Sequence, residues 1–202
     1  MKNDEIISFC QNSIIDNTTN KIEYSFTRYE DYIILHIYNP SLDRFKINSR
    51  NNRILSKLIT ILYDRLNKKG CFNNDNDGKI DYSDEDLLNN FINIEYSFIL
   101  FNKQFEPLSI LCLSDDIIWN VCTNFYHRGK GYMTILLNHI LKLIILDKLK
   151  VVVDKNNLSL KVKNDNPIRD KLVTYYNTFG FKTTDANDIY IIMHYKINIK
   201  NK

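Results

Sequence analysis

Alanine is almost absent from this 202-residue chain and occurs once, at Ala186. Asparagine, isoleucine, lysine and tyrosine abound instead, a bias typical of AT-rich genomes such as those of large DNA viruses or protists. The four cysteines have the spacing of neither a zinc site nor a disulfide framework. We therefore expect reduced thiols and a cytoplasmic protein, located in the host cytoplasm if the source is viral.

Long apolar runs and a strong net charge are also missing. The most apolar segment, residues 135–146, contains Asn138, His139 and Lys142 and is too short to span a bilayer. The first ten residues lack the apolar stretch of a signal peptide. The net charge of +3 is too small to indicate nucleic-acid binding. We expect a globular protein without a membrane or nucleic-acid partner, and its oligomeric state is unknown from the sequence.

Apolar periodicity predicts an α/β fold with a mixed, mostly antiparallel sheet flanked by helices. Short connections between neighbouring strands favour an antiparallel meander, whereas the strand–helix–strand order over 117–162 favours one parallel pair. The predicted strands are 22–26, 32–38, 96–101, 108–113, 117–123, 158–162 and 189–195. The predicted helices are 53–66, 87–92, 132–146 and 167–178, the last opened by Pro167 and closed by Gly180.

A glycine-bearing basic turn, Arg-Gly-Lys-Gly-Tyr-Met at 128–133, joins a predicted strand to a predicted helix. The first N–H groups of a helix lack partners within the helix, and with the helix dipole they bind anions. Gly129 and Gly131 let the backbone approach a phosphate closely, and Arg128 and Lys130 add positive charge. The pattern favours a phosphate site, although a basic turn that caps a core helix would contain the same residues.

The stretch 117–137, IIWNVCTNFYHRGKGYMTILL, resembles the acetyl-CoA signature of the GNAT N-acetyltransferases. That signature is a strand followed by Arg/Gln-x-x-Gly-x-Gly/Ala and an apolar helix. Arg128 and Gly131 match it, whereas Met133 stands where the family prefers Gly or Ala. The departure at Met133 bears on how the helix packs against a pyrophosphate.

A second stretch, 158–181, is similar to the family's later motif of a strand, an Asn, a helix and Tyr-x-x-x-Gly-Phe. The sequence LSLKVKNDNPIRDKLVTYYNTFGF supplies Asn166, Tyr176, Gly180 and Phe181 at these places. The likeness covers about 96–197. It implies one GNAT-like domain over 1–202, with a variable part at 1–95 and an acetyl-CoA-binding core at 96–198.

The resemblance implies direct transfer of an acetyl group from acetyl-CoA to a primary amine of an unidentified acceptor. The alternative is a non-catalytic acyl-CoA-binding or cation-responsive regulatory module on the same fold. The cofactor contacts that the likeness implies lie at the end of one strand, along the turn and its helix, and downstream. They are Val121, Cys122, Thr123, Arg128, Gly129, Lys130, Gly131, Tyr132, Met133, Thr134, Asn166 and Tyr176.

Tyr176 occupies the place whose hydroxyl serves as general acid in many members of the family, since a phenol donates a proton while neutral at pH 7. The competing interpretation is a core tyrosine. A base for the amine is not identified, because a chain of water molecules serves in many members. The side chains considered for it are Asp115, Asp116, His127 and His194.

An acidic segment, FNNDNDGKIDYSDED at 72–86, resembles an EF-hand calcium loop. Gly78 takes the place of the sharp turn and Ile80 that of the apolar anchor. Asp84 replaces the usual bidentate Glu, which predicts weak Ca²⁺ binding or a preference for Mg²⁺. A solvated turn rich in Asp and Gly would have a similar composition. The ligands that the alignment implies are Asn73, Asp75, Asp77, Lys79 through its carbonyl, Asp81 and Asp84.

Overall fold

The computed structural model describes residues 23–38, 94–149 and 153–196. They fall into two compact units. The first unit contains the chain up to Cys112 together with Asn120–Leu136, and the second contains Leu113–Trp119 and the chain from Leu137 onward. The predicted helices 53–66 and 87–92 and the EF-hand-like loop 73–84 lie outside the described residues.

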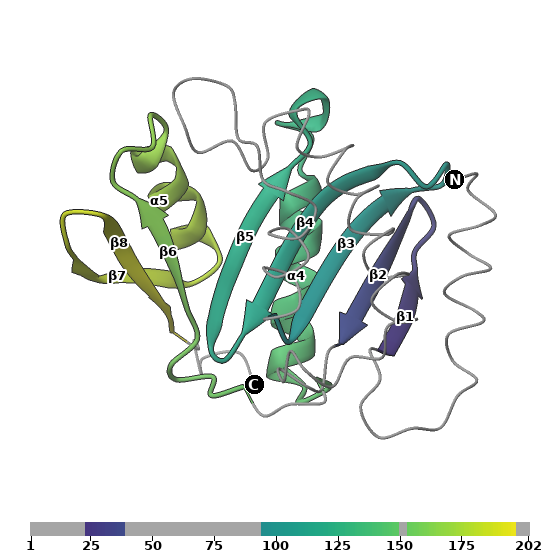
Figure 1. Cartoon of the computed structure of the whole chain (residues 1–202), viewed down its shortest axis with the longest axis horizontal. Helices are drawn as coiled ribbons and strands as arrows, with labels where there is room; N and C mark the ends of the chain where they lie inside the picture. Colours follow the sequence, from purple (N-terminus) through teal and green to yellow (C-terminus); the bar gives the residue numbers. More distant parts are fainter. Residues whose placement is uncertain (1–22, 39–93, 150–152, 197–202) are drawn as a thin grey trace, which may run out of the picture. The chain divides into compact units, whose positions relative to one another are not determined.

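Four neighbouring strands lie in the described part of the first unit (Figure 1). They are β1 (Glu23–Arg28), β2 (Tyr32–Tyr38), β3 (Tyr96–Asn102) and β4 (Pro107–Ser114). β2 pairs antiparallel with both β1 and β3. Every residue of β3 and β4 is buried except the last of each. Both faces of these strands are therefore covered, which explains why their sequences are nearly continuous apolar runs rather than alternating ones.

Three strands and one helix lie wholly within the second unit, which also contains the larger part of helix α4 (Tyr132–Ile145). β6 (Ser159–Lys163) and β7 (Phe181–Ala186) each pair antiparallel with β8 (Tyr190–Tyr195). Helix α5 (Arg169–Thr178) packs on β6 and β7, and Tyr176 is its buried residue. The helix is followed by Gly180 at a φ of 97°, a left-handed conformation that favours glycine.

Strand β5 (Ile117–Thr123) contributes residues to both units. It pairs in parallel with β6 at Ile117–Ser159 and Ile118–Leu160, as the strand–helix–strand order predicts. The hydrogen-bonded order of the eight strands is β1-β2-β3-β4-β5-β6-β8-β7. Helix α4 (Tyr132–Ile145) separates β5 from β6 in the chain. The expected mixed, mostly antiparallel sheet with helices is confirmed.

Two details of the second unit differ from the sequence prediction. Strand β7 is not predicted, because all of its residues except Phe181 are exposed and it has no apolar alternation. Helix α5 begins at Arg169 rather than at Pro167. The Asn166 side chain accepts a hydrogen bond from the N–H of Ile168 over 3.0 Å, which holds the preceding residues in a turn.

The cysteines also differ from expectation. Cys122 is disulfide-bonded, so the prediction of reduced thiols throughout is wrong for this residue. Sequence spacing could not show this, because a disulfide requires proximity in space. Cys112 is free and buried.

Within the part of the chain that the structure describes, every helix is too short or too polar to cross a membrane.

Candidate functional site

The turn between β5 and α4 places two glycines in left-handed conformations. The φ angles of Gly129 and Gly131 are 76° and 80°. A Cβ atom built on either residue would meet nothing within 4 Å, so backbone conformation rather than lack of space calls for glycine here. The carbonyl of Gly131 accepts from the N–H of Ile135 over 3.1 Å, which places Gly131 at the amino end of α4. The turn therefore leads directly into a helix N-terminus, where an anion is stabilised.

Positive charge surrounds this turn. Arg128 and Lys130 are both exposed. The Nε of Arg128 donates to the carbonyl of Thr123, the last residue of β5, over 3.2 Å. Its guanidinium carbon lies 5.4 Å from the ring centroid of Phe125. Arg128 thus folds back over the 3-10 helix η2 (Phe125–His127), beside the turn.

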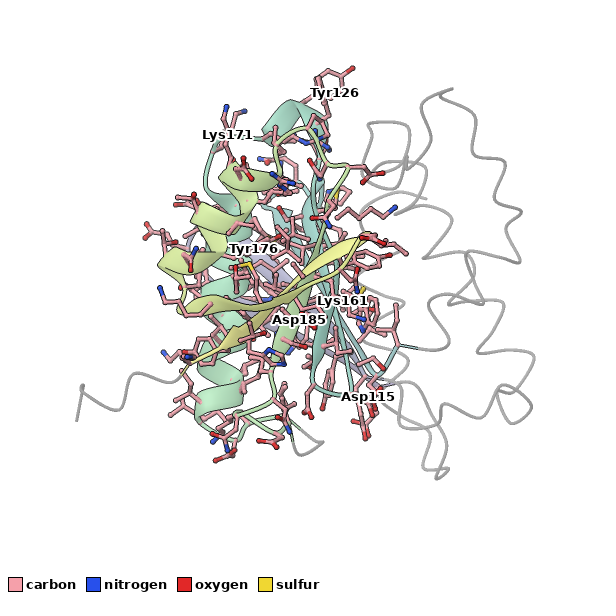
Figure 2. All side chains as sticks on the ribbon, turned by 90° about the vertical axis from the view of Figure 1, so that its left-hand side faces the viewer. Asp115, Tyr126, Lys161, Lys171, Tyr176 and Asp185 are labelled. Atoms are coloured by element: carbon pink, nitrogen blue, oxygen red, sulfur yellow. The ribbon has the colours of Figure 1, made fainter. Side chains whose placement is uncertain are left out.

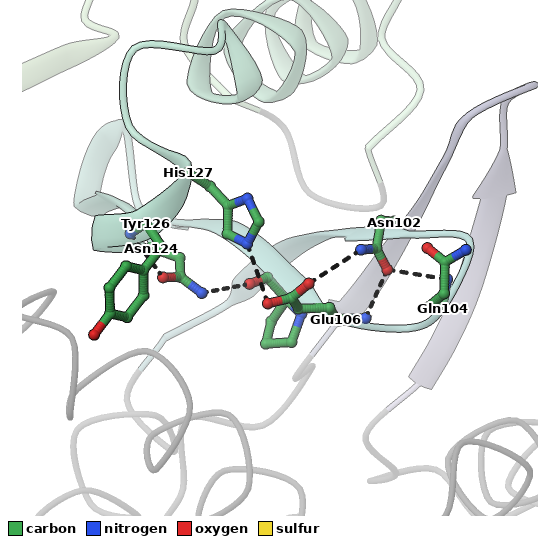
Figure 3. A network of polar contacts seen from close by, with 7 residues as sticks. Asn102, Gln104, Glu106, Asn124, Tyr126 and His127 are labelled. Carbon is green, nitrogen blue, oxygen red and sulfur yellow. Dashed lines mark hydrogen bonds and ion pairs between the residues drawn. The ribbon is translucent and has the colours of Figure 1, made fainter.

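A polar network fixes η2 to the turn between β3 and β4 (Figure 3). Glu106 accepts from the Nε2 of His127 over 3.1 Å; the imidazole is the donor because a carboxylate only accepts. The other oxygen of Glu106 accepts from the Asn102 amide over 3.3 Å. The side-chain oxygen of Asn102 in turn accepts from the backbone N–H groups of Gln104 and Glu106.

Asn124, which directly precedes η2 and is only 1% exposed, holds this helix in place. Its amide donates to the carbonyl of Pro107, and its side-chain oxygen accepts from the N–H of Tyr126, both over 3.3 Å. Its own N–H donates to the carbonyl of Leu108 over 2.9 Å. Its bonds to Pro107 and Leu108 join the end of β5 to the start of β4. Its bond to Tyr126 makes it the N-cap of η2, so Asn124 fixes the segment that leads to the glycine turn.

The remaining residues of the first motif occupy varied environments. Val121, Cys122 and Thr123 are half-buried at the end of β5, and the Thr123 hydroxyl lies 2.9 Å from that of Ser109. Tyr132 packs edge-on against Tyr32 and against His127, with ring centroids 6.0 Å apart in both pairs. Met133 and Thr134 are half-buried in the first turn of α4. The structure thus places the predicted residues 121–134 along one continuous strand end, turn and helix start.

Tyr176 lies in the second unit and is 7% exposed. Figure 2 shows it on the side of α5 toward the strands, whereas Lys171 extends outward from the same helix. Its ring packs edge-on against Tyr175 and Phe181. Burial raises the pKa of the Tyr176 hydroxyl above its ordinary value of 10, and the neighbouring Tyr175 raises it further. The hydroxyl therefore stays protonated at and well above neutral pH.

The Tyr176 hydroxyl makes no hydrogen bond with any other described residue. A buried tyrosine hydroxyl normally has a partner, and an unsatisfied one costs free energy. Asn166, the other downstream residue that the motif implies, uses its side chain to hold the turn before α5. Of the two, Tyr176 is the buried residue, whereas Asn166 is half-buried.

The residues considered as a base have other partners or locations. Asp115 and Asp116 form the two-residue turn before β5, at the opposite end of that strand from Thr123. The Asp116 carboxylate accepts from the N–H of Asp154 over 2.7 Å. The Nδ1 of His194 lies 2.6 Å from the Thr184 hydroxyl, and His127 is bonded to Glu106. None of these contacts assigns a base.

Sequence reasoning missed the anchoring residues Asn102, Glu106 and Asn124. The signal that could have found Asn124 is its type and place, since Asn before a short helical turn is a typical N-cap. Among the described residues, no group of three or more His, Cys, Asp or Glu side chains could hold a metal ion.

Several solved structures are similar to this chain, including the following two. A nourseothricin acetyltransferase aligns with 16% identity and a TM-score of 0.37, over 48% of this chain and 62% of that one. An acyl-CoA N-acyltransferase from Pseudomonas aeruginosa aligns with 14% identity and a TM-score of 0.43, over 86% of this chain and 98% of that one. No protein-family model and no curated protein match the sequence.

Proposed function

We propose that this protein is an N-acetyltransferase that transfers an acetyl group from acetyl-CoA to a primary amine. The glycine turn carries the proposal: two left-handed glycines and two exposed cationic side chains stand directly before a helix N-terminus. Such a turn suits a pyrophosphate, because its backbone N–H groups and positive charges favour an anion that can approach closely. The resemblance to the GNAT signature over 117–137 supports the same ligand.

Bound acetyl-CoA would supply the activated acetyl thioester, whose C–S bond breaks as the C–N bond to the amine forms. The backbone N–H groups of residues 129–134 would hold the pyrophosphate, and the backbone of Val121–Thr123 would pair with the pantetheine arm. Tyr176 would give its hydroxyl proton to the departing thiolate. The Tyr176 hydroxyl is protonated at neutral pH and has no hydrogen-bond partner among the described residues, which leaves its proton available to a ligand. The amine loses its proton to water or to a base that is not assigned.

CoA binding is the experiment that tests this proposal. A ligand that binds only the folded state raises the melting temperature progressively with its concentration. We expect CoA to do so, whereas adenosine without phosphates should have little effect because it lacks the anion. A melting temperature that is unchanged by millimolar CoA would exclude both the enzyme and the non-catalytic acyl-CoA-binding alternative.

A further inference from the structure

Two adjacent aromatic side chains on η2 face solvent. Phe125 is 58% exposed and Tyr126 is 65% exposed, and their ring centroids are 5.7 Å apart in an edge-to-face arrangement. Figure 2 shows the Tyr126 side chain extending away from the ribbon, and Figure 3 shows it pointing away from His127 and Glu106. We call Phe125 and Tyr126 the aromatic platform. Placing two large rings in water leaves apolar area unburied that a ligand could cover.

The backbone beneath the aromatic platform is held on both sides. Asn124, before it, is almost fully buried and bonds to Pro107 and to the N–H of Tyr126. His127, after it, bonds to Glu106. A segment ordered in advance loses less conformational entropy when a ligand binds. The two rings are thus presented from a fixed three-residue helix rather than from a loose loop.

Two cationic side chains and the glycine turn come directly after the aromatic platform in the sequence. Arg128 places its guanidinium over the Phe125 ring, 5.4 Å from the centroid, and Lys130 is exposed two residues further on. Gly129 and Gly131 then lead into α4. An exposed aromatic ring beside an anion-binding turn has the complementarity of a nucleotide, whose base stacks on a ring face and whose phosphates bind cations and N–H groups.

We propose that the aromatic platform binds the adenine base of CoA by stacking. This inference rests on the proposed function, since it extends the pyrophosphate site of the glycine turn to the adenosine end of the same ligand. The Arg128 guanidinium, which already lies over Phe125, adds cation–π attraction to the assembled stack.

The test separates the two ends of CoA by calorimetric titration. Three ligands are titrated into each protein: CoA, adenosine 3′,5′-bisphosphate and 4′-phosphopantetheine, which lacks the adenosine and its two phosphates. The double variant Phe125→Ala/Tyr126→Ala should bind CoA and the bisphosphate about tenfold or more weakly, as expected for lost base–aromatic stacking. Its affinity for 4′-phosphopantetheine should equal that of the wild type, because the turn itself is unchanged.

Two controls accompany it. Phe125→Tyr/Tyr126→Phe keeps both rings and should restore wild-type affinity for CoA. Tyr29→Ala removes another exposed tyrosine of the first unit and should change no affinity. Melting temperatures of all variants should match, since surface positions contribute little to stability.

Each other result overturns the inference. Unchanged CoA affinity in the double Ala variant would show that the rings do not touch the ligand. Equal weakening of all three ligands would show that they act through the shape of the turn. A wild type that binds CoA and 4′-phosphopantetheine equally well would leave the proposed function intact but remove the adenine contact. A wild type that binds none of the three would instead refute the proposed function itself.

Discussion

Gly131→Asp is expected to abolish the thermal stabilisation of the protein by CoA, whereas Gly131→Asn should retain most of it. The φ of 80° at this position is tolerated by Asn and Asp better than by other side chains, and the space around it is open. The two variants differ mainly in one negative charge. A carboxylate at the helix N-terminus would occupy the proposed anion site and repel a pyrophosphate, which costs several kcal/mol, or on the order of 100-fold or more in affinity.

The comparison of Gly131→Asp with Gly131→Asn separates charge from folding, because Asp at this position favours the helix itself. A negatively charged side chain in an N-cap position stabilises an α-helix, so the ligand-free melting temperature of Gly131→Asp should not fall below that of Gly131→Asn. A loss of CoA binding then reflects the charge and not unfolding. If both variants respond to CoA as the wild type does, the turn at 128–133 is not where the pyrophosphate binds.

Tyr176→Phe should slow acetyl transfer by about 10²-fold while the affinity for CoA is retained. The change removes one hydroxyl and almost no volume, and a general acid contributes on the order of 10²- to 10⁴-fold to a rate. Stability should be equal or slightly higher, because the lost hydroxyl is buried without a hydrogen bond to any other described residue. The measurements are steady-state transfer, CoA binding and the melting temperature.

The pH dependence gives a second test of the same residue. Burial raises the pKa of Tyr176, so its hydroxyl remains a proton donor as the pH rises from 7 to 9, and transfer should not decline over this range through its ionisation. Tyr175→Phe, the matched control on the same helix, should leave turnover unchanged.

Two outcomes of the Tyr176→Phe experiment would contradict the role as general acid. Equal turnover would mean that Tyr176 is a core tyrosine, and lost CoA binding would mean that its role is structural.

The sequence predicted those elements whose apolar pattern is set by burial. The boundaries of β2 and β5 agree with the prediction, and α4 begins at Tyr132 as expected. Strand β7 was not predictable in this way, because its pairing with β8 fixes it while its side chains face solvent. Periodicity reports which face of an element is buried and carries no signal where neither face is.

The candidate site shows the same division. The glycine turn and Tyr176 were candidates from the sequence because both lie in stretches that resemble GNAT motifs, and their roles stay predictions. The bond between Glu106 and His127 joins residues from two separate turns, so no local pattern indicates it. The exposure of Phe125 and Tyr126 was equally hidden, because an aromatic residue after a strand more often lies in the core.

Transfer of an isotopically labelled acetyl group tests the central claim most directly. The protein is incubated with [¹³C]acetyl-CoA and one acceptor from each of four classes: amino sugars, polyamines, small amines and proteins with free amino groups. Mass spectrometry then follows the acceptors while free CoA thiol is assayed. We expect at least one class to gain labelled N-acetyl groups with one thiol released per acetyl transferred, and Gly131→Asp to give neither. No labelled product in any class, with thiol release no faster than without protein, would contradict the assignment as an N-acetyltransferase.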